Sequence, residues 1–262
     1  MDNLNTLSEK INQNKTLDFG NILSQSIELF KKVWTQGMLL ILLSIAIIIP
    51  LYLLIYIPIV FFGIMSPAAL GPESISENEA VAMGIGLIII TCILGLAIVF
   101  CFMVVIFGLQ TAFYRICKIK DLNEIGSDDF FHFLKKDHLK KTIALSLYSF
   151  GIYLLATMLC YLPVFYVMVP MSFVSVIHAF NPNLSTSDII NLSFKIGNKY
   201  WLITFGLMFV AGLMAELGLF LCIIGIIATA AFALLPQYFI YKDVIGFEEN
   251  NDEIEKIGLT ED

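Results

Sequence analysis

The residues of this chain that could do chemistry are few and far apart. An intramembrane hydrolase or an ion-coupled carrier needs a carboxylate, or a histidine with a carboxylate, inside an apolar segment. Only Glu216 lies deep within such a segment. It follows Trp201 by 15 residues (216 − 201), which is about 22 Å along a helix. This position predicts a residue near the outer membrane boundary that reaches water or caps a turn, and a functional intramembrane site is the less favoured alternative.

The three histidines give a second candidate chemistry. His132 and His138, with Asp128 and Asp137 nearby, have ligand types that bind zinc. They are six positions apart and so do not share a helix face. We therefore predict a solvated charged surface rather than a metal site. His178, at the cytoplasmic end of an apolar segment, is predicted to be a polar interfacial residue rather than a proton relay.

Known catalytic motifs are missing from the sequence. It contains no HExxH, no GxSxG, no Walker loop and no GxGxxG after a strand. The five cysteines form no CxxC, and four lie in apolar runs where a free thiol behaves as a small hydrophobe. These observations predict a protein that is not an enzyme and has neither metal nor cofactor.

The composition indicates a membrane protein. Of 262 residues, 58% are hydrophobic and 14% are charged, whereas a soluble domain is about half apolar and a quarter charged. No Lys, Arg, Asp or Glu occurs in 33–70, 80–114, 142–187 or 200–215. Runs of about 18 or more apolar residues are transmembrane candidates. The net charge of -7 comes mainly from the last residues, and nothing indicates a nucleic-acid partner.

One pattern occurs twice and organises the chain. Residues 22–34 and 189–201 align with a shift of 167 positions (189 − 22), and both tryptophans of the chain fall in register. Each copy reads as an amphipathic interfacial helix that leads into an apolar span. The predicted anchors at the membrane interface are the aromatic and basic residues Trp34, Trp201, Lys32 and Lys199. The predicted helix-packing contacts are the small polar residues Ser26 and Ser193.

These segments predict an all-α membrane protein with six transmembrane helices arranged as three hairpins. Each hairpin would follow an amphipathic helix, the first starting at Asp18, the second capped by Ser127 or Asp128, and the third capped by Ser185 in S-x-x-D form. The first and third units would form a pseudo-repeat, with Pro50, Pro58 and Pro170 as kinks. The predicted spans are 37–63, 83–109, 142–161, 163–180, 200–217 and 223–241. They lie in one domain, 16–246, between a polar tail, 1–15, and an acidic tail, 247–262.

The distribution of basic residues predicts the orientation. With six spans and both termini inside, all 15 Lys and Arg residues are cytoplasmic. Five or seven spans would place either the first or the last lysines outside. We therefore expect a multi-pass protein of the bacterial cytoplasmic membrane with both termini cytoplasmic, and membrane lipids or other membrane proteins as its partners.

Several short motifs also carry a resemblance. Ser193-Phe194-Lys195 before Trp201-Leu202, Leu162-Pro163 upstream and Tyr241 to Gly246 at the close resemble a family of six-span bacterial inner-membrane proteins of unknown function. That family is similar to the membrane region of some glycerophosphodiester phosphodiesterases. The phosphodiesterase active site of those relatives lies in a separate domain, so the resemblance assigns no catalytic residue here.

Two classes of function fit the sequence. The favoured one is a non-catalytic membrane component, namely a scaffold, an assembly partner or a lipid-interacting protein. The alternative is a small permease with a path between the hairpins, which would need polar groups on broken helices at the membrane midplane. An intramembrane enzyme ranks third.

Overall fold

The computed structural model describes residues 4–13, 15–64, 77–159, 162–218 and 223–247. Every regular element in these ranges is helical, in agreement with the predicted all-α class. The α-helices are α1 (Leu4–Asn12), α2 (Phe19–Ile64), α4 (Glu77–Leu122), α5 (Lys136–Met158), α6 (Leu162–Phe180), α7 (Thr186–Lys199), α8 (Trp201–Glu216), α9 (Ile223–Thr229) and α10 (Leu235–Val244). Two 3-10 segments, η1 (His132–Leu134) and η3 (Ala230–Leu234), interrupt the series.

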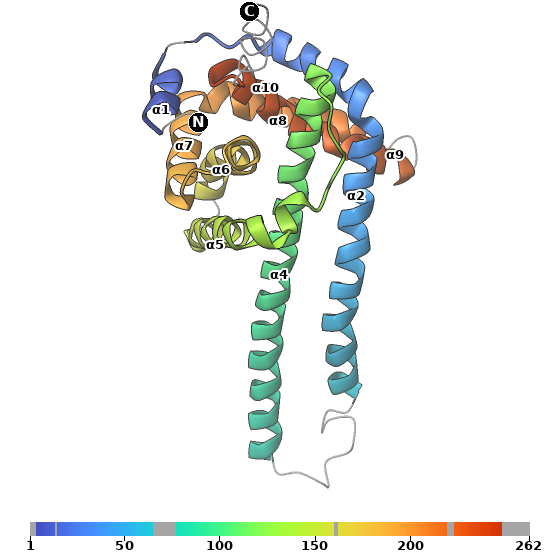
Figure 1. Cartoon of the computed structure of the whole chain (residues 1–262). Coiled ribbons are helices and arrows are strands. Elements are labelled where there is room, and N and C mark those ends of the chain that lie inside the picture. Colours follow the sequence, from blue (N-terminus) through green and yellow to red (C-terminus); the bar gives the residue numbers. More distant parts are fainter. Residues whose placement is uncertain (1–3, 14, 65–76, 160–161, 219–222, 248–262) are drawn as a thin grey trace, which may run out of the picture.

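The helices α2 and α4 form a long hairpin that extends well beyond the other helices (Figure 1). Each has 46 residues, or about 69 Å of helix, more than twice the hydrocarbon thickness of a bilayer. The far part of the hairpin is open, whereas the last turns of α4 are buried at Leu109, Phe113 and Cys117. The hairpin therefore has one end packed in the helical body, and among the described residues no other helix lies along its far part (Figure 1).

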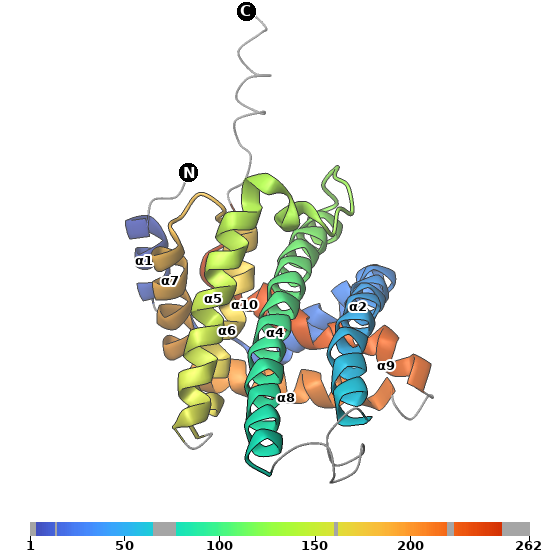
Figure 2. The same cartoon turned by 90° about the horizontal axis from the view of Figure 1, so that it is seen from below.

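The helical body is built around α6. Its residues Phe173, Val174 and Ile177 are fully buried, and α4, α5, α7 and α10 all pack against it. In Figure 1, α5 and α6 are seen along their axes while the α2–α4 hairpin runs down the page, and Figure 2 shows α5 and α6 lengthwise beside α4. These helices thus cross the hairpin at a large angle.

Among the described residues, four helices, α2, α4, α5 and α6, are long and apolar enough to cross a membrane. They coincide with most of the predicted spans 37–63, 83–109, 142–161 and 163–180, although α5 ends at Met158 and the last two residues of the span 142–161 lie outside the described residues. A fifth candidate is the pair α7 and α8, which is bent by 88°. The predicted span 223–241 is divided into α9, η3 and α10. The coarse prediction of long apolar helices is confirmed, while the six transmembrane helices in three hairpins and the pseudo-repeat stay predictions.

Two boundaries differ from the sequence prediction. The first interfacial helix and the first span form one continuous helix, α2, which passes through Pro50 and Pro58. The predicted second interfacial helix, capped by Ser127 or Asp128, is not a separate element, because α4 continues to Leu122 and the chain then passes through η1 into α5. By contrast, the caps at Asp18 and Ser185 are present: their side-chain oxygens accept from the amides of Asn21 at 2.6 Å and Asp188 at 3.2 Å.

The N-terminal segment was predicted to be a polar tail, but residues 4–12 form α1. Leu7 and Ile11 lie four positions apart, hence on one face, and both are buried. The packing partner of α1 is α7, far away in the sequence. A short amphipathic helix therefore docks on the helical body where the composition alone indicates a solvated tail.

Candidate functional site

The two copies of the repeated pattern bury equivalent residues. In α2 the buried stripe is Ile22, Ser26, Leu29 and Val33, and in α7 it is Ile189, Ser193, Ile196 and the following Tyr200. The members of each stripe are spaced i, i+4, i+7 and i+11, which is one face of a helix. The sequence alignment thus identifies the same buried positions in both copies.

The close crossing of α6 and α7 distinguishes the second copy. A Cβ atom at Gly197 would lie 2.6 Å from the Cα of Pro170, so the two backbones touch at this point. The aligned residue in α2 is Phe30 (197 − 167), whose ring packs edge-on against Phe232 with centroids 5.5 Å apart. The glycine permits a helix-to-helix approach that a phenylalanine prevents.

The two tryptophans have different surroundings. The Trp34 side chain is 46% exposed. The Trp201 indole is half-buried, donates from Nε1 to the carbonyl oxygen of Tyr166 at 3.1 Å and stacks on Phe205 with ring centroids 5.0 Å apart. Trp201 therefore joins α8 to α6, whereas Trp34 is exposed, and its role as an interfacial anchor stays a prediction.

The two aligned lysines differ in the same way. Lys32 is exposed. The Lys199 ammonium donates to the carbonyl oxygens of Ile11 at 2.7 Å, Asn12 at 3.0 Å and Gln13 at 3.0 Å. These carbonyls end α1, and a cation there complements both the unpaired oxygens and the helix dipole. The predicted anchor Lys199 thus contacts α1.

Several buried hydroxyls have no hydrogen-bond partner among the described residues. Ser26 donates to the carbonyl of Ile22 at 2.8 Å. Its counterpart Ser193 is buried without a partner, as are Ser146, Ser149 and Thr204. A desolvated hydroxyl without a partner costs free energy. The predicted packing role of Ser26 and Ser193 agrees with their burial, and among the described residues neither hydroxyl bonds to a neighbouring helix.

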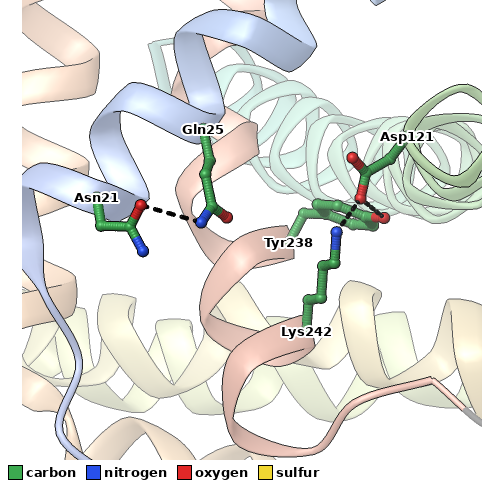
Figure 3. Close-up of polar contacts among 5 residues, drawn as sticks. All are labelled: Asn21, Gln25, Asp121, Tyr238 and Lys242. Carbon is green, nitrogen blue, oxygen red and sulfur yellow. Dashed lines mark hydrogen bonds and ion pairs between the residues drawn. The ribbon is translucent and has the colours of Figure 1, made fainter.

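A cluster of polar side chains, Asp121, Tyr238 and Lys242, joins the end of α4 to α10 (Figure 3). Asp121 Oδ2 accepts from the Tyr238 hydroxyl at 2.9 Å and from Lys242 Nζ at 2.5 Å. Asn21 and Gln25, one turn apart on α2, hydrogen-bond to each other at 3.1 Å beside this cluster. Neither Asp121 nor Lys242 stood out in the sequence, because each belongs to a polar stretch with several alternative charges.

Two further lysines lie at helix ends. Lys15 donates to the carbonyl oxygen of Asp243 near the end of α10, and Lys141 donates to the carbonyls of Pro182, at 2.6 Å, and Leu184 after α6. With Lys199, they neutralise carbonyl groups at three places where helices end. These three lysines thus have structural partners within the fold.

An open cavity of about 430 Å³ lies between α1 and the end of α10. Lys10, Gln13 and Lys15 line it from one side, and Lys242, Asp243 and the turn 244–246 line it from the other. Burial raises the pKa of the Asp243 carboxyl, and Lys15 and Lys242 counteract this rise. No sequence pattern indicates this cavity, because its walls are more than 220 residues apart (242 − 15).

The histidines come closer together than their spacing predicts. The rings of His132 and His138 have centroids 4.9 Å apart, and Phe133 packs against both and against His178. The prediction that His132 and His138 would stand apart assumed one helix, and the 3-10 turn η1 brings them together. Even so, no group of three His, Cys, Asp or Glu side chains that could hold a metal occurs in the described ranges. His178 is fully buried, and its predicted position at the cytoplasmic interface stays a prediction.

Electrostatics at the histidine pair involve Asp129. A hydrogen bond from Lys135 at 2.5 Å lowers the pKa of the Asp129 carboxyl. Partial burial, Arg115 and His138 lower the pKa of His132. Because the Asp129 pKa is depressed in the folded state, its small contribution to stability is present above the ordinary carboxyl pKa and is lost as the pH falls.

Glu216 is the last residue of α8 and is exposed. Close to it, a Cβ atom at Gly218 would lie 2.5 Å from the carbonyl oxygen of Gly225, so the chain reverses tightly at this point. Thr229 donates to the carbonyl of Ala215 at 2.5 Å and ties α9 to α8. The predicted turn near 218–225 agrees with this geometry, although 219–222 lie outside the described residues.

Compared with known proteins, the chain matches no protein-family model, no curated protein and no solved structure. The resemblance to a six-span inner-membrane family therefore stays a prediction.

Proposed function

We propose that this chain is an integral protein of the cytoplasmic membrane that acts without catalysis, through helix surfaces that contact lipids or other membrane proteins. The observation that carries the proposal lies on α4, where Ile88, Ile89 and Ile90 are 64%, 53% and 57% exposed. Consecutive helical residues point about 100° apart, so apolar side chains are exposed on several sides of α4. A helix that is apolar all round is stable only when it is buried or in lipid.

The proposed topology places both termini in the cytoplasm. It is supported by the packing of charges at one end of the hairpin: Lys242 of α10 pairs with Asp121 of α4, and Lys15 contacts α10. Arg115, Lys118 and Lys120 occupy the last turns of α4, near the same end. Basic residues concentrated on one side of the apolar segments are typical of the cytoplasmic side.

The polar side chains near the break between α9 and α10 favour a scaffold over a permease. A permease would need such a break in a helix, with polar groups that face the transport path. However, Thr229 binds backbone carbonyls of α8 and α9. With its amide nitrogen turned toward η3, Gln237 donates to Leu234 at 2.8 Å and Ala233 at 3.1 Å. Both side chains bind backbone carbonyls of the helices on either side of the break instead of facing a path.

The test is purification in native-membrane nanodiscs followed by mass spectrometry of the lipids and proteins that remain bound. We expect a reproducible set of partners that diminishes when a polar residue replaces an exposed apolar one in the hairpin, as in Ile89→Ser. Ile125→Ser is the matched control, because Ile125 is fully exposed in the polar loop after α4. An unchanged partner set with Ile89→Ser would contradict the proposed role of the hairpin surface.

A substitution at Glu216 distinguishes the scaffold hypothesis from the permease hypothesis. Since it is exposed at the end of α8, we expect Glu216→Gln to accumulate normally and to complement a deletion as the wild type does. Normal accumulation with complete loss of function would overturn the scaffold and favour an ion-coupled permease.

A further inference from the structure

Each wall of the cavity between α1 and α10 is stabilised by its own set of contacts. Lys199 fixes the end of α1 through three carbonyl oxygens. Asp121 and Tyr238 fix α10 from the side of α4. Gly246, with φ of +79°, closes the turn after α10 in a conformation that L side chains rarely adopt. The cavity is therefore formed before any ligand enters it, which reduces the entropic cost of binding.

The charges around the cavity favour an anion. Three lysines, Lys10, Lys15 and Lys242, line it together with the carboxylate of Asp243, and a second carboxylate, Asp121, pairs with Lys242. An ammonium has three donors, and the contacts of Lys15 with the Asp243 carbonyl and of Lys242 with Asp121 orient these groups. The lysines therefore exceed the two carboxylates by one charge (3 − 2).

The size and position of the cavity limit the kinds of anion that could bind there. A volume of about 430 Å³ exceeds that of a bare phosphate and suits a phosphate with an attached polar group. Lysines bind phosphate as point charges, and clusters of lysines next to membrane spans attract anionic headgroups. A phosphate-bearing ligand satisfies both conditions.

We propose that the cavity lined by Lys10, Lys15 and Lys242 binds a phosphate group, supplied either by an anionic lipid headgroup or by a free phosphate compound. The lipid source rests on the proposed membrane function, whereas binding of free phosphate does not. If the proposed function failed, the chain would not fractionate with membranes. If only this inference failed, it would do so normally but without selective phosphate binding.

The test uses the full chain in detergent and in nanodiscs. Titration calorimetry with inorganic phosphate measures the free anion, and native mass spectrometry measures retention of phosphatidylglycerol against phosphatidylcholine. We expect Lys10→Gln to weaken binding about tenfold, the effect of losing one charge-assisted hydrogen bond. Lys140→Gln, an exposed lysine of α5 outside the cavity, is the control and should bind as the wild type does.

Each outcome of these binding experiments either supports or overturns the proposed phosphate site. Selective retention of phosphatidylglycerol that Lys10→Gln removes assigns the headgroup, and saturable phosphate binding without lipid selectivity assigns the free compound. The proposal is overturned if neither probe binds, or if Lys140→Gln weakens binding as much as Lys10→Gln. Thermal unfolding of both variants checks that the fold is intact, and Lys15→Gln replaces Lys10→Gln if the latter unfolds.

Discussion

The start of α2 and the α7–α8 junction have closely related sequences but different structures. In the first copy the helix continues past Val33 and Trp34 into the α2–α4 hairpin. In the second copy the chain bends by 88° between Lys199 and Trp201. Both copies bury the same face, including Ile22 and Ile189. The buried face is thus encoded locally, whereas the path of the chain after it depends on tertiary partners.

The partners of the second copy explain the difference. Gly197 allows α7 to touch the backbone of α6 at Pro170, and Lys199 holds the end of α1. In the first copy Phe30 occupies the position of the glycine and packs against η3, and Lys32 is exposed. One copy is therefore a junction between helices of the body, and the other extends a helix out of it.

The largest effect is expected at Gly197. Gly197→Ala places a Cβ 2.6 Å from the Pro170 backbone, so we expect a loss of up to about 3 kcal/mol in the free energy of unfolding from overpacking. Gly151→Ala is the control, because nothing lies within 4 Å of its Cβ position, and alanine should stabilise that helix by up to about 1 kcal/mol. Thermal unfolding in detergent measures both, and equal shifts would contradict the close crossing.

The next effect concerns the aligned lysines. Lys199→Met removes the contacts with three carbonyl oxygens of α1, and we expect a loss of about 2 kcal/mol because hydrogen bonds to a charged group are lost. Lys32→Met should change stability by less than about 0.5 kcal/mol, as is usual for surface positions. Hydrogen exchange of α1 should accelerate only in Lys199→Met, and unchanged exchange would rule out this anchor.

The tryptophans should show a smaller difference. Trp201→Phe keeps an aromatic ring but removes the hydrogen bond to the Tyr166 carbonyl, at a cost of about 1 kcal/mol. Trp34→Phe removes no hydrogen bond to the described residues, and we expect its main effect to be shallower anchoring at the interface. Unfolding temperatures that fall equally in both variants would contradict the distinction.

The repeated helices show how far the sequence predicts this fold. The periodicity of apolar residues in 22–34 and 189–201 predicted the buried faces, and the caps at Asp18 and Ser185 were legible because they depend on neighbouring residues. The docking of α1, the partner of Lys199 and the cavity beside Lys242 were not predicted. Each joins segments more than 170 residues apart (186 − 12), and the sequence holds no pattern that pairs them.

The smallest effect is expected at the aligned serines. Ser193→Ala removes a buried hydroxyl without a partner among the described residues, so we expect it to be neutral or stabilising by up to about 1 kcal/mol. Ser26→Ala removes a bond within its own helix and should change stability by less than about 0.5 kcal/mol. Strong destabilisation by Ser193→Ala would mean that its hydroxyl has a partner, such as a buried water.

Cysteine accessibility in intact cells tests the central claim, a membrane-spanning hairpin with its polar end in the cytoplasm. In a chain without its native cysteines, an impermeant maleimide should label Ile75→Cys from outside. Lys10→Cys and Asp252→Cys should react only after the membrane is permeabilised. External labelling of position 10 or position 252 in intact cells would contradict the account.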